Sequence, residues 1–220
     1  MKISLVALGK IGLPLAVQFA MKGHEVIGCD VNAKTVDLVN QGIEPFPGEA
    51  HLDKYLKEVV GAKKLTATTD TTAAVAESDA VVVVVPLFVD GEGVPDFGWM
   101  DDATAKIAAG LKKGTLVSYE TTLPVGTTRN RFAAALEKGS GLKAGVDFDL
   151  VFSPERVLTG RVFADLRKYP KLVGGINKQS TAAGIKFYEA VLDFDQRSDL
   201  NQPNGVWDLG TCEALSLIHI

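Results

Sequence analysis

The residues whose types and spacing best suit a binding site are two glycines and an aspartate near the start of the sequence. Gly9 and Gly12 stand between two apolar runs, residues 3–7 and 26–29, and Asp30 follows the second run directly. Gly9 lets the backbone approach a pyrophosphate closely, and Gly12 lets a helix pack tightly on the first strand. The separation of Gly12 and Asp30 is close to the ~20 residues at which a carboxylate accepts hydrogen bonds from a dinucleotide ribose. The stretch therefore predicts a dinucleotide-binding strand, turn, helix and strand.

The turn between the two runs also offers hydrogen-bond donors to an anion. Free N–H groups at the start of the helix face the phosphates of a bound dinucleotide, and the helix dipole adds to the attraction. Lys10 and Ile11 lie between the glycines and join them in the predicted cofactor-binding set. A carboxylate at Asp30 repels a 2′-phosphate and no arginine follows it, so the sequence favours NAD over NADP.

The motif departs from the usual glycine pattern at its first position. Ala7 stands where G-x-G-x-x-G has its first glycine, so the stretch reads A-x-G-x-x-G. Because a Cβ penalises the left-handed region, we expect Ala7 to take the turn with a negative φ. An ordinary glycine turn in an α/β protein is the alternative interpretation, but the flanking strand and acid favour cofactor binding.

Size and charge narrow the classes of function. The chain has 220 residues, a hydrophobic content of 46% and a formal net charge of −4. This length suits one large domain, or one domain and part of a second. A negative net charge does not indicate the basic surface that binds nucleic acid. The apolar run 80–85 has the length of a strand, far short of a membrane helix.

The thiols and imidazoles form no recognisable metal set. Cys29 and Cys212 show no paired spacing, and the three histidines stand apart from cysteines and carboxylates. We therefore expect no metal site. The cysteine usage, and a strand that begins at once without a signal peptide, indicate the cytoplasm.

Strand-like and helix-like segments alternate along the chain. Strands are expected near residues 3–7, 26–29, 64–70, 79–86, 114–120, the first part of 147–161 and 171–175, and helices near 13–22, 31–42, 50–60, 71–77, 101–111, 127–138 and 180–192. This alternation predicts an α/β fold with a doubly wound parallel sheet. The run 80–85 has no polar alternation, which is typical of a strand buried on both faces. Pro86 ends that strand at the carboxyl edge of the sheet, where such folds bind ligands, so it joins the cofactor-binding set.

The last residues differ from the rest of the chain. Residues 193–208 are polar and turn-rich, residues 209–214 indicate the start of a helix, and residues 215–220 form an apolar tail. The tail LSLIHI resembles one reading frame of a sequencing-library adapter. We therefore interpret it as non-native and the chain as a fragment cut within a domain; a genuine short C-terminal strand is the alternative.

Four stretches carry a resemblance to a known family. They are VALGKIGLPLA, GCDVNAKTVDLVNQG, YETTLPVGTT and FSPERVLTG, in this order. With them the chain resembles the nucleotide-sugar dehydrogenases, which include the UDP-glucose and UDP-N-acetylmannosamine enzymes. The resemblance implies an NAD-binding domain over residues 1–192 and the start of a central helical domain over 193–214. It also implies a homodimer that oxidises the primary alcohol of a UDP-sugar to a carboxylate by two hydride transfers.

The same resemblance gives roles to residues that follow two of the strands. Thr122 resembles the family threonine that hydrogen-bonds active-site water or the reacting oxygen, and Thr121 beside it is expected to contact the cofactor. Glu155 resembles the family glutamate that handles protons or water in thioester hydrolysis. Arg156 would meet the charge of the substrate. The alternatives are a helix cap for Thr122 and an ion pair with Arg156 for Glu155. For Arg156 itself, the alternative is a surface arginine without a role in binding.

The sequence also departs from the family. The family's nucleophilic cysteine, lysine and asparagine lie beyond this chain, and neither Cys29 nor Cys212 has the glycine-rich setting of that cysteine. Leu87 replaces the threonine that many members carry after Pro86. The order Pro-Glu-Arg, where UDP-glucose enzymes have Pro-Glu-Phe, favours the branch typified by UDP-N-acetylmannosamine.

Two other functions stay open at this point. A non-catalytic dinucleotide-binding module is one, because Ala7 and Leu87 would then mark a decayed site. A β-hydroxyacid or 6-phosphogluconate type of dehydrogenase is the other, because its cofactor domain is similar. The stretches TTLPVGTT and SPERV speak against this last interpretation.

Overall fold

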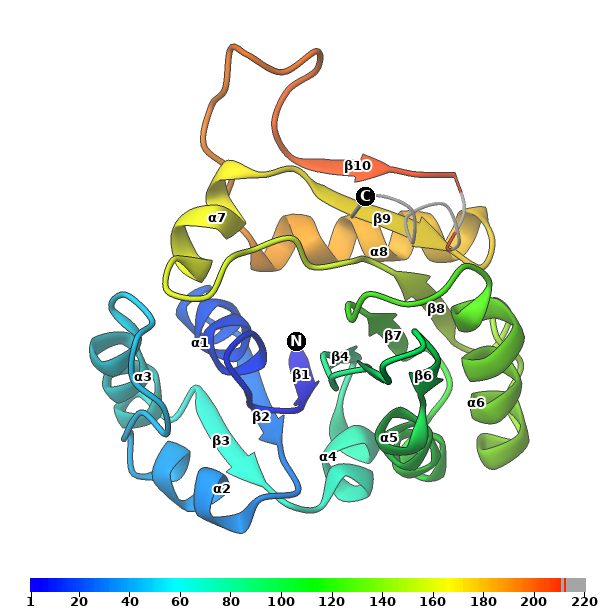
Figure 1. Ribbon diagram of the computed structural model, residues 1–220, viewed down its shortest axis with the longest axis horizontal. Coiled ribbons are helices and arrows are strands. Elements are labelled where there is room, and N and C mark those ends of the chain that lie inside the picture. The colour runs from blue at the N-terminus through cyan, green and yellow to red at the C-terminus, as the bar shows by residue number, and fades with distance from the viewer. Residues whose placement is uncertain (211, 213–220) are drawn as a thin grey trace.

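An eight-stranded sheet forms the centre of the molecule. The structure is a computed structural model that describes residues 1–210 and 212. The strands lie in the order β10-β9-β8-β7-β4-β1-β2-β3, with helices on both faces, and β5 and β6 form a separate hairpin (Figure 1). The predicted tail, residues 215–220, and half of the predicted helix start at 209–214 lie outside the described residues.

Strands and helices alternate along most of the chain, as the sequence predicts. The strands are β1 (Lys2–Val6), β2 (Glu25–Cys29), β3 (Leu65–Thr68), β4 (Ala80–Val83), β5 (Phe88–Val89), β6 (Pro95–Asp96), β7 (Leu116–Tyr119), β8 (Asp149–Phe152), β9 (Lys171–Gly175) and β10 (Val206–Asp208). The helices are α1 (Gly12–Met21), α2 (Ala33–Asn40), α3 (Leu52–Gly61), α4 (Thr71–Glu77), α5 (Gly98–Gly110), the π-helical turn η1 (Thr128–Phe132), α6 (Ala133–Ser140), α7 (Val162–Lys168) and α8 (Lys178–Val191).

The strands from β3 to β8 in the sheet are mutually parallel. β1 pairs with β2 and β4, β2 with β3, β4 with β7, and β7 with β8. Their spatial order is that of dinucleotide-binding folds: successive strands are added on one side of β1 up to β3, and on the other side from β4 onwards. The predicted doubly wound α/β sheet is therefore confirmed.

The far edge of the sheet is not parallel, which the sequence did not predict. β9 pairs antiparallel to β8, and β10 pairs parallel to β9. The chain between β8 and β9 contains only the short helix α7 and re-enters the sheet from the edge at which β8 ends. Because this connection does not cross the sheet, β9 runs in the opposite direction.

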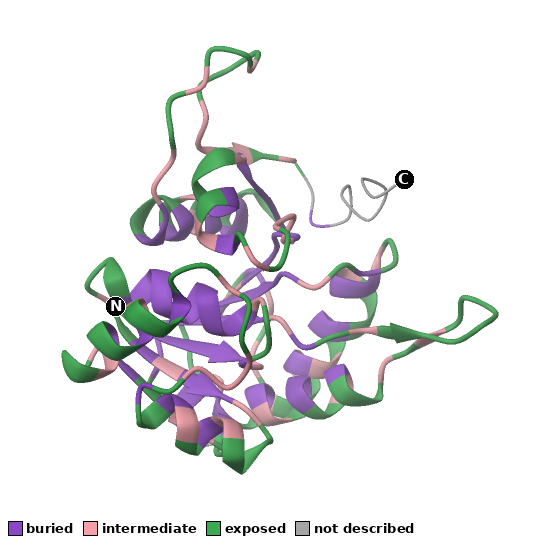
Figure 2. Ribbon diagram, turned by 60° about the vertical axis from the view of Figure 1, so that its left-hand side comes forward, coloured by how far each residue is buried: buried purple, intermediate pink, exposed green. Residues whose placement is uncertain are grey.

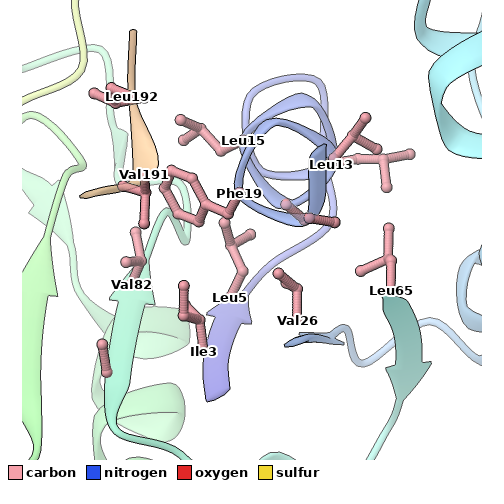
Figure 3. Packing of buried hydrophobic residues seen from close by; sticks show 14 of the residues in the cluster. Ile3, Leu5, Leu13, Leu15, Phe19, Val26, Leu65, Val82, Val191 and Leu192 are labelled. Carbon is pink, nitrogen blue, oxygen red and sulfur yellow. The ribbon is translucent and has the colours of Figure 1, made fainter. Parts of the chain in front are cut away.

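Two cores fill the space on the two faces of the sheet. Val82 of β4 belongs to the first core together with Ile3 and Leu5, whereas Val81 and Val83 belong to the second. All three valines are fully buried, so the prediction of a strand buried on both faces is confirmed. Figure 3 shows the first core beneath helix α1, and Figure 2 shows buried residues along the strands and the inner faces of the helices.

Several short elements fold differently from the prediction. Residues 89–98 and the segment between β8 and β9 fall outside the expected strands and helices, yet they contain part of the hairpin β5–β6 and the helix α7. The turn-rich segment 193–208 ends in β10. The helix expected at 127–138 is divided into η1 and α6. These elements are too short to show a hydrophobic period, so local pattern does not reveal them.

Candidate functional site

The predicted site residues lie at one edge of the sheet. The parallel strands β1, β2, β4, β7 and β8 all end there, and they are followed in turn by Gly9, Asp30, Pro86, Thr122 and Glu155. The point between β1 and β4, where the order of strands in the sheet reverses, opens at this same edge, and ligands bind at this point in such folds. The topology therefore brings together residues that are far apart in the sequence.

A cleft of about 490 Å³ opens at this edge. Gly9, Asp30 and Pro86 lie in its wall, at the ends of β1, β2 and β4. Helix α5 supplies another part of the wall, where Trp99 and Lys106 line the cleft. A mainly apolar cleft with a few charged groups has the size and character of a site for a small organic ligand.

The turn after β1 contradicts one expectation from the sequence. Ala7 has a φ of +80°, not the negative value expected for a residue with a Cβ. The Ala7 N–H donates to the Cys29 carbonyl at 2.8 Å, and the Leu8 N–H donates to Asp30 Oδ2 at 2.8 Å. The chain must turn sharply between these two bonds, which offset the ~1–2 kcal/mol that the left-handed region costs an alanine. Asp30 thus shapes the turn as well as lining the cleft.

The two glycines have the different surroundings that a dinucleotide site requires. A Cβ on Gly9 would meet nothing within 4 Å, and Gly9 borders the cleft. A Cβ on Gly12 would lie 1.9 Å from the Ala7 carbonyl oxygen and 2.7 Å from a methyl of Val84. No side chain caps the start of α1 within the described part of the chain, so its N–H groups can face an anion. These residues fit the pyrophosphate and ribose of a dinucleotide.

The remaining cofactor candidates face the site in different ways. Lys10 is exposed and lines a second pocket of about 120 Å³, whereas Ile11 packs partly buried against the first core. Thr121 Oγ1 donates to the Val85 carbonyl at 2.6 Å, which ties the end of β7 to the end of β4. Leu87 packs partly buried against the second core, so apolar contacts occupy the position of the missing threonine.

Thr122 is exposed beside these loops. The turn η1 begins after Thr127, and no side chain of the described residues caps it, so Thr122 does not have the capping role that was the alternative. The Glu155 N–H donates to the Glu120 carbonyl at 3.0 Å, and Glu120 lies just before Thr121. The loops that carry Thr122 and Glu155 are therefore neighbours.

Glu155 pairs with a lysine that sequence reasoning missed. Lys171 Nζ lies 2.8 Å from Glu155 Oε2 and 2.7 Å from Glu120 Oε2. The Arg156 side chain does not form the expected alternative ion pair; its guanidinium donates to the Pro170 carbonyl, and only its backbone N–H donates to Glu155 Oε1, at 2.8 Å. The sequence did contain a sign of this pair, because charged residues stand next to buried strands: Glu120 directly follows one, and Lys171 starts another.

Burial and charge together set the protonation of this cluster. Burial raises the pKa of Glu120 to about 7, although the Lys171 ammonium favours its ionised form. Burial also opposes ionisation of Glu155, but Lys171 outweighs it and the pKa of Glu155 is lowered. Burial disfavours the charged form of Lys171, and the two carboxylates more than reverse this, so its pKa is raised.

Comparison with known proteins identifies the family of this domain. The model of the UDP-glucose/GDP-mannose dehydrogenase family, NAD binding domain, matches residues 1–192. The chain belongs to this family. NAD is therefore the dinucleotide of the domain, as the carboxylate at Asp30 predicts, and the resemblance seen in the sequence is confirmed.

Individual relatives within the UDP-glucose/GDP-mannose dehydrogenase family are about twice as long as this chain. It is 34% identical over 190 residues to UDP-N-acetyl-D-mannosamine dehydrogenase of Pyrococcus horikoshii, which covers 86% of the chain and 44% of the relative. The crystal structure of NDP-N-acetyl-D-galactosaminuronic acid dehydrogenase from Methanosarcina mazei matches with a TM-score of 0.88 at 32% identity, over 98% of this chain and 45% of that one. A 3-hydroxyisobutyrate dehydrogenase of Mycobacterium tuberculosis, with a TM-score of 0.59 at 16% identity, shares the fold alone.

The two cysteines of the chain, Cys29 and Cys212, are both buried. Cys29 lies in β2, and burial raises the pKa of its thiol to about 12. Cys212 Sγ lies 3.7 Å from a guanidinium nitrogen of Arg129. Because the thiolate is the nucleophile, a buried thiol with a raised pKa such as Cys29 is unreactive.

Two further properties of the domain concern ions and membranes. Among residues 1–210 and 212, no group of three or more His, Cys, Asp or Glu side chains is placed to hold a metal ion. In the same part of the chain, none of the helices is long and apolar enough to span a membrane.

Proposed function

We propose that this chain is the NAD-binding half of a UDP-sugar 6-dehydrogenase, which oxidises the primary alcohol of a nucleotide sugar to a carboxylate by two hydride transfers. UDP-N-acetylmannosamine is the favoured substrate, ahead of UDP-glucose. The observation that carries the proposal is the convergence of Gly9, Asp30, Thr122 and Glu155 at one edge of the sheet. The Pro-Glu-Arg sequence and the named relatives support the 2-acetamido sugar.

The residues around the first turn hold the cofactor. NAD, when bound, supplies the hydride acceptor. Asp30 accepts hydrogen bonds from the ribose hydroxyls through the lone pairs that its backbone contacts leave free. The N–H groups at the start of α1, beside Lys10 and Ile11, bind the pyrophosphate, and Gly9 keeps the space open for it. Pro86 and Thr121 border the cofactor at the ends of β4 and β7.

The residues after β7 and β8 act on the sugar. The Thr122 hydroxyl hydrogen-bonds active-site water or the reacting oxygen. Glu155 accepts a proton from water at a carboxylate oxygen when a thioester is hydrolysed. Arg156 meets the negative charge of the substrate with the N–H donors that its bond to the Pro170 carbonyl leaves free.

The nucleophile and the rest of the substrate site are proposed to come from outside this chain. Residues 1–192 form the NAD-binding domain, residues 193–214 lead into a central helical domain, residues 215–220 are non-native, and the whole protein is a cytoplasmic homodimer. Because Cys29 is buried, we expect the purified chain to bind NAD without oxidising UDP-N-acetylmannosamine, as followed by NADH absorbance. NADH formation by the chain alone would contradict this division of labour.

The preference for NAD is expected to depend on the charge of Asp30. Asp30→Asn keeps an oxygen that can accept the Leu8 N–H bond and removes the charge that attracts ribose hydroxyls and repels a 2′-phosphate. Since a hydrogen bond to a charged group is worth about 1.5–3 kcal/mol, the Kd for NAD should rise by about 10- to 100-fold. The Kd for NADP should change much less or fall. Calorimetric titration of both dinucleotides measures the two effects.

The matched control is Asp37→Asn, which makes the same charge change at an exposed position of α2. It should leave both affinities unchanged. Equal weakening of NAD and NADP binding by Asp30→Asn would remove the ribose role of this carboxylate.

A further inference from the structure

A lysine between two carboxylates is buried directly behind the proposed proton acceptor. Lys171 Nζ contacts Glu120 Oε2 at 2.7 Å and Glu155 Oε2 at 2.8 Å. The exposed fractions of the three side chains are 5% for Lys171, 0% for Glu120 and 12% for Glu155. Solvent therefore does little to screen the charges of this cluster.

The hydrogen bonds of Glu120 continue away from the site. Tyr188 OH donates to Glu120 Oε1 at 2.7 Å, and the same hydroxyl lies 2.6 Å from Ser118 Oγ. Both carboxylate oxygens of Glu120 are thus occupied, one by the ammonium of Lys171 and one by the phenol. A continuous chain of polar atoms runs from Ser118 to Glu155.

In this chain of polar atoms, one ammonium is in direct contact with two buried carboxylates. The charged and titratable groups that face one another are Glu120 after β7, Glu155 and Arg156 after β8, Lys171 on β9 and Tyr188 on α8. The Arg156 guanidinium donates to the Pro170 carbonyl and acts on Glu155 through its charge alone, so the Lys171 ammonium is the cation in direct contact with both carboxylates. Because an uncompensated buried charge is costly, the cluster favours holding one proton.

We propose that Glu120 is a positioning residue that competes with Glu155 for Lys171 and thereby sets how strongly Glu155 binds a proton. The proposal deepens the function given above and rests on it for the role of Glu155 as proton acceptor. When Glu120 carries the proton, Lys171 belongs to Glu155 alone and stabilises its carboxylate, so Glu155 is a weak base. When Glu120 is ionised, Lys171 is shared and Glu155 is a stronger base.

The physical setting of the two carboxyl groups agrees with this competition. Burial raises the pKa of Glu120 to about 7, whereas Lys171 lowers the pKa of Glu155 despite its burial. Glu120 therefore changes its charge near neutral pH while Glu155 stays ionised. Interacting groups titrate in steps that belong to the cluster as a whole, so both carboxyl carbons should report both steps.

The test is a titration of the purified chain, labelled with ¹³C at the glutamate carboxyl carbons, followed by NMR between pH 3 and pH 9. In the unaltered chain, the Glu120 and Glu155 signals should share a step near neutral pH. Glu120→Gln keeps the shape of the side chain and removes its charge, so this step should vanish. The main step of Glu155 should move at least one pH unit lower, a tenfold change in its proton affinity.

Companion variants separate this effect from a merely structural one. Glu120→Asp restores a carboxylate and should restore the step near neutral pH. Tyr188→Phe removes one donor to the ionised form of Glu120 and should move that step to higher pH. Glu58→Gln, at an exposed position of α3, should change nothing. If Glu120→Gln does not fold, the shift with Tyr188→Phe decides the question.

Two results would overturn the proposal: a step near neutral pH that persists in Glu120→Gln, or a Glu155 titration that is the same with and without the Glu120 charge. A calorimetric titration with NAD on the same samples tests the proposed function separately. If the chain does not bind NAD but the titrations of Glu120 and Glu155 are coupled, the proposed function is rejected and the coupling stands. If the chain binds NAD normally but the two titrations are independent, the coupling is rejected and the proposed function stands.

Discussion

Replacement of Lys171 by methionine is expected to lower the free energy of unfolding by about 3–5 kcal/mol at pH 8. The ammonium is the shared partner of two carboxylates, since Lys171 Nζ lies 2.7 Å from Glu120 Oε2 and 2.8 Å from Glu155 Oε2. Without it, two buried carboxylates lose the cation that is in contact with both of them. Urea unfolding of both proteins, followed by circular dichroism, measures the difference.

The loss should depend on pH in a definite direction. Burial already places the pKa of Glu120 near 7, above its ordinary value, so the folded state binds this proton more tightly than the unfolded state. Stability from this group is thus present at low pH and lost as pH rises towards 7. Lys171→Met should raise the pKa of both carboxyl groups further, so the variant should recover much of its stability at pH 5.5.

An exposed pair provides the control for this variant. Lys106 Nζ lies 2.7 Å from Asp102 on the surface of α5, and Lys106→Met should cost less than about 1 kcal/mol at either pH. A loss for Lys171→Met that is equally small, or that does not change between pH 5.5 and 8, would contradict the account of the buried cluster.

Alanine at Gly12 is the second change with a large expected effect. The new Cβ would lie 1.9 Å from the Ala7 carbonyl oxygen, 2.7 Å from Val84 and 2.9 Å from Leu5, so α1 must move away from the sheet. Overpacking of this kind costs about 1–3 kcal/mol and sometimes more. Because backbone is involved, we expect at least about 3 kcal/mol, measured as a lower midpoint of urea unfolding.

Alanine at Gly9 is the matched control, with the opposite balance of effects. A Cβ there meets nothing within 4 Å, and Gly9 does not have a positive φ, so stability should stay within about 1 kcal/mol. The methyl group nevertheless enters the space reserved for the pyrophosphate, so the Kd for NAD should rise at least tenfold. Loss of stability in Gly9→Ala with full NAD affinity would reverse the roles of the two glycines.

The parts of the fold that local pattern could reveal are those with long, regular elements. The run of valines in β4 and the strand, helix and strand around Gly12 were predicted because burial on both faces and a glycine turn leave marks in consecutive residues. The antiparallel strand β9 and the strand β10 leave no such mark. Their direction depends on how short connections return to the sheet, which is a property of the whole chain.

The candidate site divides in the same way. Asp30 was predicted from its spacing, but its bond to the Leu8 N–H, and with it the positive φ of Ala7, depends on a contact across two strands. Glu120 and Lys171 are 51 residues apart, and only the pairing of β7, β8 and β9 brings them together. No spacing rule links such residues, because their separation depends on the loops between the strands.

A crystal structure of this chain with NAD tests the central claim most directly. The account predicts that the dinucleotide occupies the cleft at the carboxyl ends of β1, β2 and β4, with a ribose hydroxyl hydrogen-bonded to Asp30 and the pyrophosphate over Gly9 at the start of α1. A saturated crystal whose dinucleotide lies elsewhere, or whose ribose makes no contact with Asp30, would contradict it.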